Sequence, residues 1–328
     1  MTLLPLSPRE PPLRLGPFRT ESGTTLPDLR VAFRRDGPPG SSAVLVVHAL
    51  TGSADAAGDW WEPLIGPGRA LDTDIRAVVC FNLLGSCYGT TGPRDVDDFP
   101  PITPRDLARA QWAALDALGI EHLELVTGGS LGGMVSLEVA LERPRSVAAV
   151  VPIAAPAVIG NLAAGWNYIQ LELLKIERDR GLELARQLAM TTYRSEVDFE
   201  TRDGIGSYLE HQGVKLRQRF DAGSYAALTG AMNAHDIGRQ RGGLVAAFRA
   251  LAAHDVAVMG VGIEGDILFG PRQVHALVEA ARSAGADASY REIRSDKGHD
   301  AFLVEWDQVT SFLREALQRA EEGVAASA

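Results

Sequence analysis

Cysteine and long apolar runs are scarce in this chain of 328 residues. Two cysteines, Cys80 and Cys87, are too few for a disulfide framework, and they have neither C-x-x-C spacing nor a histidine nearby. We expect both to be buried thiols. No apolar run reaches the roughly 20 residues of a membrane helix, and 1–17 carries prolines and charges where a signal peptide would be apolar. The sequence therefore predicts a cytoplasmic protein with no membrane association.

Positive charge is also in short supply, because 32 Lys and Arg face 42 Asp and Glu and leave a formal net charge of -10. Nucleic acid would not attract such a chain over long range. A small anionic substrate stays possible, since screening confines electric fields to about 10 Å and a local arginine can hold a carboxylate or phosphate. The sequence also has no metal-ligand cluster, Walker loop or dinucleotide fingerprint. We expect small-molecule substrates, no metal and no permanently bound cofactor.

The apolar segments predict an α/β fold with a mostly parallel sheet. Expected strands are 43–47, 75–81, 123–127, 146–153, 256–262 and 288–293. A helix is predicted from Pro104, with Thr103 as its N-cap and Gly119 just after its end. Near the N-terminus, 18–20 and 29–33 flank turn signals and are predicted to pair as an antiparallel hairpin.

The pattern changes between the expected strands 146–153 and 256–262. Helical periodicity and charge-rich segments fill 157–243, with no convincing strand. We predict a core of 1–156 and 244–328, with 157–243 inserted as a helical cap above the carboxyl ends of the strands. The cap is expected to select the substrate. Taken alone, its Thr192–Ser195 and Arg219–Asp221 segments are interpreted as ordinary surface or helix-packing residues.

A G-x-S-x-G sequence surrounds Ser130, directly after the expected strand 123–127 and before a helix-like stretch. In this context the pattern is typical of a nucleophile elbow, in which the serine occupies strained backbone at a strand end. The helix that follows would direct its first amides toward the place where an oxyanion forms. We therefore predict that Ser130 is a nucleophile.

A serine nucleophile needs a base and an acid that orients the base. Where a nucleophile elbow carries the serine, the acid follows the serine along the chain and the histidine follows the acid. Asp266 lies on a loop after strand 256–262, and His299 follows strand 288–293 and Gly298, which we expect to bring the histidine close to the elbow. These are the predicted acid and base. Three nearby acids remain alternatives to Asp266: Glu264, Asp255 and Asp296. The other six histidines have the wrong chain order or lack a glycine turn.

An oxyanion hole in this fold takes one amide after the nucleophile and one from the loop after an early strand. The sequence assigns these to the amides of Leu131 and Leu50. His48, at the start of the same loop, is expected to order the loop and not to take part in the chemistry.

Linked motifs along nearly the whole chain resemble one family, the α/β-hydrolase-fold homoserine O-acetyltransferases of methionine biosynthesis. The motifs are 48–52, 60–61, 65–68, 71–74, 82–93, 98–100, 128–134, 192–195, 219–221, 266–269 and 298–303.

The resemblance implies an α/β-hydrolase fold with a helical cap and a triad of Ser130, Asp266 and His299. It implies that Arg194 holds the carboxylate and Asp300 the ammonium of the acceptor, L-homoserine. It further implies acetyl-CoA as the acyl donor, a ping-pong reaction through acyl-Ser130, and a homodimer that forms through the cap helices.

Several alternatives stay open at this point. The cap is shorter than is usual in that family, so a succinyl donor or L-serine as acceptor would need only a few pocket changes around the same triad. A plain serine esterase would differ only in admitting water to the acyl-serine. A non-enzymatic binding protein with the same fold is a third class.

Overall fold

A seven-stranded sheet runs through the protein in the order β13-β12-β11-β10-β6-β9-β5. The computed structural model describes residues 10–40 and 42–327. Six strands are parallel, and only β5 runs antiparallel to its neighbour β9. The predicted mostly parallel sheet is therefore confirmed. Its strands are β5 (Phe33–Asp36), β6 (Ser42–Val47), β9 (Ala77–Phe81), β10 (His122–Gly129), β11 (Ala149–Ile153), β12 (Ala257–Ile263) and β13 (Ala288–Ile293).

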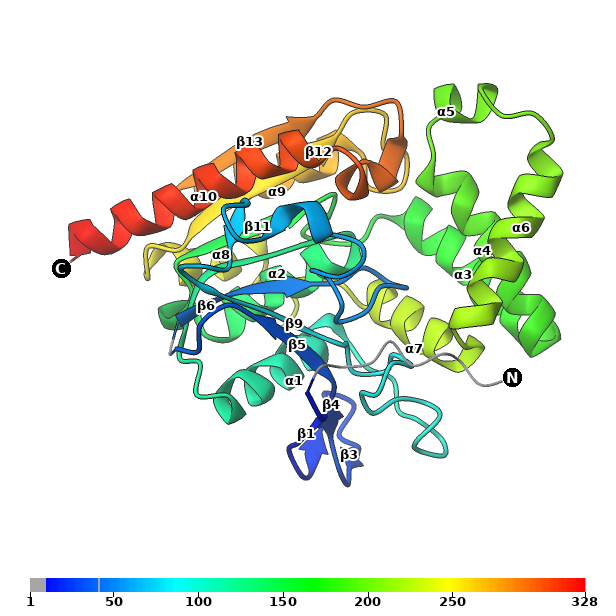
Figure 1. Ribbon diagram of the computed structural model, residues 1–328, viewed down its shortest axis with the longest axis horizontal. Coiled ribbons are helices and arrows are strands. Elements are labelled where there is room, and N and C mark those ends of the chain that lie inside the picture. The colour runs from blue at the N-terminus through cyan, green and yellow to red at the C-terminus, as the bar shows by residue number, and fades with distance from the viewer. Residues whose placement is uncertain (1–9, 41, 328) are drawn as a thin grey trace.

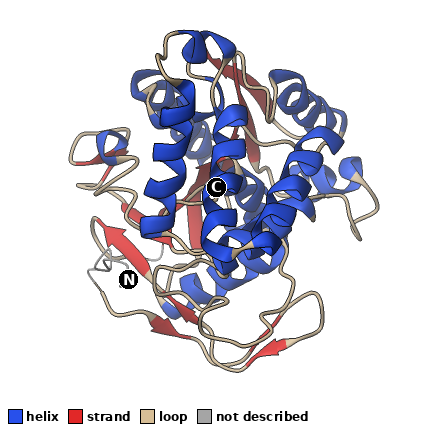
Figure 2. Cartoon of the chain, turned by 90° about the vertical axis from the view of Figure 1, so that its right-hand side faces the viewer, coloured by secondary structure: helices blue, strands red, loops and turns tan. Residues whose placement is uncertain are grey.

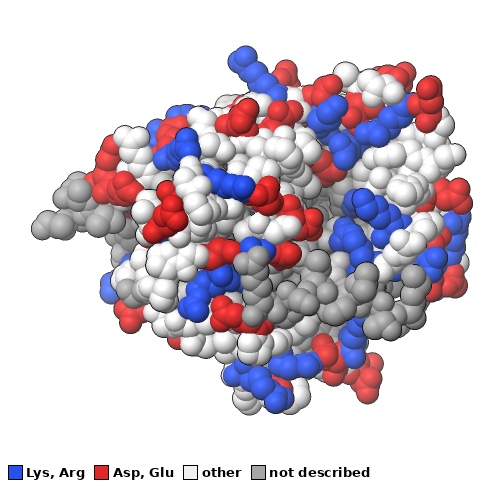
Figure 3. Space-filling view, in the orientation of Figure 1, with Lys and Arg blue, Asp and Glu red and all other residues white. Residues whose placement is uncertain are grey.

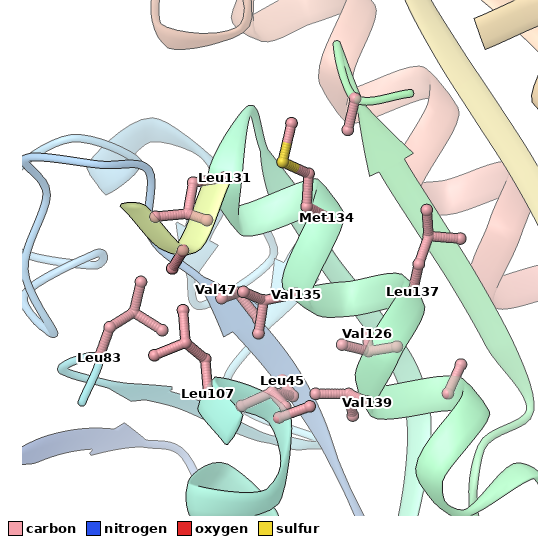
Figure 4. Packing of buried hydrophobic residues seen from close by; sticks show 14 of the residues in the cluster. Leu45, Val47, Leu83, Leu107, Val126, Leu131, Met134, Val135, Leu137 and Val139 are labelled. Carbon is pink, nitrogen blue, oxygen red and sulfur yellow. The ribbon is translucent and has the colours of Figure 1, made fainter. Parts of the chain in front are cut away.

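Helices bury both faces of this sheet (Figure 1). In β6, Leu45 and Val47 belong to the apolar cluster on one face, whereas Val44 and Val46 belong to the cluster on the other. Strands buried on both faces read as continuous apolar runs, which is why this strand was visible in the sequence. One face packs on α1 (Pro104–Ala117), α2 (Leu131–Glu142), α8 (Leu244–Ala252) and α9 (Pro271–Ser283), and the other on α10 (Trp306–Ser327). Figure 4 shows α2 side chains packed over β6 and β10.

Helix α1 begins and ends as its sequence predicts. The Thr103 side chain accepts a hydrogen bond from the Asp106 amide, and the Asp106 carboxylate accepts one from the Thr103 amide. Gly119 follows the last turn with a φ of +70°. These contacts satisfy backbone groups that the helix itself cannot pair.

The predicted hairpin between 18–20 and 29–33 is wrong. The tight turn at Ser22 and Gly23 brings Phe18 and Arg19 next to the residues that follow it at once, so they pair there. The observed antiparallel pairs are β2 (Phe18–Arg19) with β3 (Thr25–Leu26) and β1 (Leu13–Arg14) with β4 (Arg30–Val31).

The two thiols differ in exposure. Cys80 is buried within β9 as expected, but Cys87 is only partly buried, so that expectation is wrong for Cys87. Burial is the main reason that the pKa of the Cys87 thiol rises to about 12. Across residues 10–40 and 42–327, no helix combines the length and apolarity needed to cross a membrane.

Five of the six described helices between β11 and β12 lie together at one end of the molecule, on the right in Figure 1 and toward the viewer in Figure 2. We call them the cap helices: α3 (Asn161–Ile176), α4 (Arg178–Tyr193), α5 (Glu196–Glu200), α6 (Ile205–Arg219) and α7 (Ala222–Asn233). The chain enters and leaves them side by side. The Ile159 amide donates to the His235 carbonyl at 3.0 Å, and the Ile237 amide donates to the Ala157 carbonyl at 3.1 Å.

A cluster of ion pairs fixes the chain where it leaves the cap helices. Arg241 contacts the buried Glu138 of α2 at 2.7 Å, and Arg105 of α1 contacts the same carboxylate at 3.4 Å. Arg105 and Arg239 also bind Glu21, at 3.0 and 2.6 Å. Removing one member of such a cluster weakens the pairing of the mostly buried charges that stay behind.

Glu138→Gln is expected to lower the free energy of unfolding by about 3 kcal/mol, because it removes a carboxylate shared by two buried guanidinium groups. Glu279→Gln is the control, because Glu279 pairs with Arg282 at the surface and should change stability by less than about 0.5 kcal/mol. Urea unfolding followed by circular dichroism measures both. Equal losses in the two variants would contradict the structural importance of the cluster.

Candidate active site

Ser130 lies at the turn between β10 and α2, with φ of 58° and ψ of -124°. Residues other than glycine rarely adopt this backbone, so the predicted strain is confirmed. A Cβ on Gly132 would lie 2.2 Å from the Val47 carbonyl oxygen, so only glycine lets the first turn of α2 approach β6 this closely. The Ser130 residue is 6% exposed and lines a cavity of about 490 Å³.

His299, in the 3-10 helix Gly298–Leu303, lines the same cavity and contacts Asp266, which lies on the loop after β12. The imidazole Nδ1 lies 2.7 Å from Asp266 Oδ2, and Asp266 Oδ1 accepts hydrogen bonds from the amides of Leu268 and Phe269 at 2.8 and 3.0 Å. Three acceptor contacts hold the carboxylate in one orientation. The opposite imidazole nitrogen, Nε2, is buried and has no hydrogen-bond partner among the described residues. The Ser130 hydroxyl therefore shares the cavity with His299 without a direct hydrogen bond to it.

The alternative acids lie elsewhere. Glu264 and Asp255 are exposed, and Asp296 is half-exposed and pairs with Lys297 at 3.2 Å. Among the carboxylates of the described chain, Asp266 is the one that contacts the His299 ring directly.

The pKa of His299 is raised above its usual value. Burial is the largest single influence and lowers the pKa, because it disfavours the charged ring. The negative charges of Asp266 and Asp300, together with the hydrogen bond to Asp266, outweigh that effect. A histidine with a raised pKa needs a higher pH to be present as the neutral base.

Both amides expected to form an oxyanion hole have the freedom to do so. Leu131 is the first residue of α2, so its amide has no carbonyl partner within the helix. The Leu50 amide lies in the turn after β6 and makes no hydrogen bond to another described residue. Leu50 and Ser130 both line the cavity.

Arg194 and Asp300 form an ion pair with each other, with Nη2 and Oδ2 3.2 Å apart. Both side chains are mostly buried, and Arg194 Nε has no hydrogen-bond partner in the described chain. Asp300 lines the cavity beside His299. The structure thus brings together all seven residues that the sequence singled out, with the predicted ligand-binding pair joined to each other.

Gly298 has a second role besides the expected one. The sequence suggested that it brings His299 toward the elbow, and a Cβ on Gly298 would lie 2.6 Å from the Ser195 amide nitrogen and 2.8 Å from the Arg194 carbonyl carbon. The glycine therefore also permits a close approach to the end of α4, next to the His299 that lines the cavity with Ser130. Two further contacts support this approach: Ser195 Oγ donates to the Asp296 carbonyl, and Lys297 binds Asp198 at 3.2 Å.

The cap helices also supply cavity residues that the sequence analysis did not assign to the site. The Tyr193 ring centroid lies 5.6 Å from that of His299, and Tyr193 lines the cavity with Arg186, Lys215 and Arg219. Tyr193 and Arg219, interpreted from the sequence alone as surface or helix-packing residues, thus line the cavity, and Arg219 is exposed. Helical spacing carried a signal: Arg186 precedes Tyr193 by two turns, and Lys215 precedes Arg219 by about one. On the face in Figure 3, basic side chains gather beside the hollow next to the cap helices.

Gly298→Ala is expected to destabilise the protein more than Gly285→Ala. Both glycines have positive φ, +67° and +88°, which costs a residue with a Cβ about 1 to 2 kcal/mol. Only Gly298 also faces backbone atoms at clashing distance, whereas Gly285 faces open space. Urea unfolding of both variants isolates the clash. Equal destabilisation would show that the contact between the Gly298 loop and α4 is not tight.

Comparison with known proteins agrees with this architecture. Residues 42–305 match the family model described as alpha/beta hydrolase fold. The homoserine O-acetyltransferase of Thermus thermophilus is 43% identical over 347 residues, covering 92% of this chain and 89% of the relative. The crystal structure of homoserine o-acetyltransferase from Staphylococcus aureus matches with a TM-score of 0.83 and 30% identity, covering 93% of this chain and 94% of that chain.

The crystal structure of esterase E22 also matches, with a TM-score of 0.86 over 93% of this chain and 98% of that chain. Its 19% sequence identity shows a shared fold alone. The relative that is 43% identical over most of both chains confirms the resemblance predicted from the motifs. The chain belongs to the homoserine O-acetyltransferase family of the α/β-hydrolase fold.

Proposed function

We propose that this protein transfers an acetyl group from acetyl-CoA to the side-chain hydroxyl of L-homoserine, through an acyl-Ser130 intermediate. The observation that carries the proposal is the cavity that Ser130 and His299 share with Asp300, whose partner is Arg194. An acyl-transfer centre therefore lies beside one fixed negative and one fixed positive charge. A free amino acid carries the complementary pair.

In the first half-reaction, His299 Nε2 takes the Ser130 proton while Oγ attacks the thioester carbonyl. The Leu131 and Leu50 amides stabilise the oxyanion. The C–S bond then breaks, His299 returns the proton to the sulfur, and CoA leaves acetyl-Ser130. Asp266 keeps the imidazole in the tautomer with its proton on Nδ1, which leaves Nε2 free to act as the base.

In the second half-reaction, His299 takes the proton from the homoserine hydroxyl, and the oxygen attacks acetyl-Ser130. The ester bond to Ser130 breaks, His299 returns the proton to Oγ, and O-acetyl-L-homoserine leaves for methionine biosynthesis. Water could attack the same intermediate. Tyr193 covers one side of the His299 ring, which reduces the access of water to the base.

The two charged groups of the acceptor would replace the ion pair between Arg194 and Asp300. Its carboxylate would bind Arg194, whose Nε is buried without a partner, and its ammonium would bind Asp300. A carboxylate can accept two parallel hydrogen bonds from a guanidinium group, and such charge-assisted bonds are stronger than neutral ones. A neutral ester would leave both charges unused, which favours a transferase over a plain esterase.

The acyl donor would enter past Arg186 and Lys215, which line the cavity and make no ion pair to another described residue. Arg186 also lies over the Tyr193 ring, with its Cζ 5.3 Å from the centroid. Cations without a carboxylate partner suit the phosphates of CoA. The donor is a substrate, and the proposed reaction needs no permanently bound cofactor.

We also propose a homodimer that forms through the cap helices. Helix α3 exposes four large apolar side chains, Leu162, Tyr168, Ile169 and Ile176, which are 65%, 62%, 48% and 75% exposed. Clustered exposed apolar residues are typical of association surfaces. Because the reaction consumes acetyl-CoA in amino-acid biosynthesis, we propose a cytoplasmic location.

The proposed reaction predicts that L-homoserine strongly stimulates CoA release from acetyl-CoA, with weaker effects from L-serine or with succinyl-CoA as donor. A thiol reagent measures the release, and mass spectrometry of the enzyme without acceptor should find acetyl-Ser130. Ser130→Ala should lower turnover by at least about 10⁴-fold. Ser136→Ala, on the same helix, should retain activity because its hydroxyl contacts only the Gly132 carbonyl. CoA release at one rate with and without homoserine would indicate a hydrolase and contradict the proposal.

Asp300→Asn is expected to move the acid limb of the pH profile for acylation by acetyl-CoA to lower pH. Asp300 helps to raise the His299 pKa, so removing its charge lowers that pKa and keeps the base neutral in more acidic solution. The same variant should raise the KM for homoserine about 10-fold, through loss of a charge-assisted contact. Asp255→Asn is the control, an exposed carboxylate that does not contact His299. An unchanged acid limb in Asp300→Asn would rule out His299 as the titrating base.

A further inference from the structure

Arg219 joins the cap helices to the loop after β6. As the last residue of α6, it donates from Nη1 to the Thr51 carbonyl at 2.6 Å and to the Tyr88 hydroxyl at 3.1 Å. Its Nη2 lies 3.3 Å from Thr51 Oγ1. Arg219 makes no ion pair to a carboxylate of the described residues. Its N–H groups instead donate to neutral oxygens of Thr51 and Tyr88. Phe220, the next residue, is buried, and its ring packs edge-on against Tyr88 at 5.7 Å.

The loop that Arg219 contacts is a four-residue turn. The Gly52 amide donates to the Ala49 carbonyl at 2.9 Å, which closes the turn, and Leu50 and Thr51 occupy its two central positions. The Leu50 amide belongs to the same peptide plane as the Ala49 carbonyl and points away from it. Whatever fixes this turn therefore fixes the direction of the Leu50 amide.

His48 holds the first half of the turn from the core side. Its Nδ1 lies 2.7 Å from the Ala49 carbonyl oxygen, and its Nε2 accepts a hydrogen bond from the Leu83 amide at 3.0 Å. Complete burial lowers the pKa of His48 to about 4, so the ring is neutral and donates from Nδ1. The second half of the turn has its side-chain support from the cap, through Arg219 and Thr51.

We propose that Arg219 is a positioning residue that holds the oxyanion hole in its working geometry, so that the placement of the cap helices controls acylation of Ser130. With Arg219 in place, the turn is fixed between His48 and the cap, and the Leu50 amide points into the cavity. Without it, Thr51 can rotate and the amide loses its direction. The inference rests on the oxyanion role proposed for Leu50, and it applies to any acyl donor that reaches Ser130.

A second reading of Arg219 is that it binds the donor's phosphates, since it lines the same cavity as Arg186 and Lys215. The two readings differ in their effect on a donor without phosphates. A phosphate contact matters only for acetyl-CoA. A positioned oxyanion hole matters equally for p-nitrophenyl acetate, which acylates a serine through the same tetrahedral intermediate.

Arg219→Gln is therefore tested with both donors, following nitrophenol release and CoA release. We expect the kcat of acylation to fall about 10- to 100-fold with each donor, because a small misplacement of an oxyanion donor costs a large part of its effect. The KM for p-nitrophenyl acetate should change little. Lys215→Gln should instead raise the KM for acetyl-CoA, which gives the pattern of a phosphate contact. Arg249→Gln, an exposed arginine on α8 without a partner in the described chain, controls for the loss of one positive charge.

Arg219→Lys keeps the charge and one donor toward the Thr51 carbonyl, so it should recover part of the lost kcat with both donors. This variant also serves if Arg219→Gln fails to fold, which circular dichroism would detect. A loss confined to the KM for acetyl-CoA, in either variant, would overturn the inference. If homoserine fails to stimulate the wild-type enzyme while Arg219→Gln still slows acylation of Ser130, the proposed acceptor is wrong and the inference about Arg219 stands.

Discussion

A Cβ on Gly132 would lie 2.2 Å from the Val47 carbonyl oxygen, so the first turn of α2 lies as close to the end of β6 as a backbone permits. This contact sets the position of two other parts of the site. It fixes Ser130 at the top of β10 in a conformation that costs energy, which the packing of β10 and α2 must supply. It also brings the loop that follows Val47 next to the serine, so Leu50 and Ser130 line one cavity from different elements.

The cap helices share the apolar cluster on one face of the sheet, and polar contacts around the cavity attach them further. Arg194, Ser195 and Asp198 bind the loop that carries His299, whereas Arg219 binds the loop that carries Leu50. Partly exposed ion pairs and hydrogen bonds contribute little stability each, so their main effect is to set geometry.

Much of the fold could be predicted because its signals are local. The strands β6, β9, β11 and β12 are continuous apolar runs, since helices cover both faces, and α1 carries its own capping residues. The predicted pairing of 18–20 with 29–33 failed because a two-residue strand has no strong pattern, and the nearest turn then decides its partner. The expected burial of Cys87 failed for a similar reason, because its loop has no periodicity that separates inside from outside.

For the site, chain order and flanking glycines were enough to single out Ser130, Asp266 and His299, since an elbow and two strand ends leave a short list of side chains. The sequence by itself determined the fold class, the family and these candidate residues. Only the tertiary structure decided that Arg194 pairs with Asp300, that Gly298 packs against α4 and that Arg219 reaches Thr51. The sequence pattern of one segment indicates its local hydrogen bonds and which of its side chains are buried. Contacts between distant side chains depend on how whole elements pack, and no single segment carries that information.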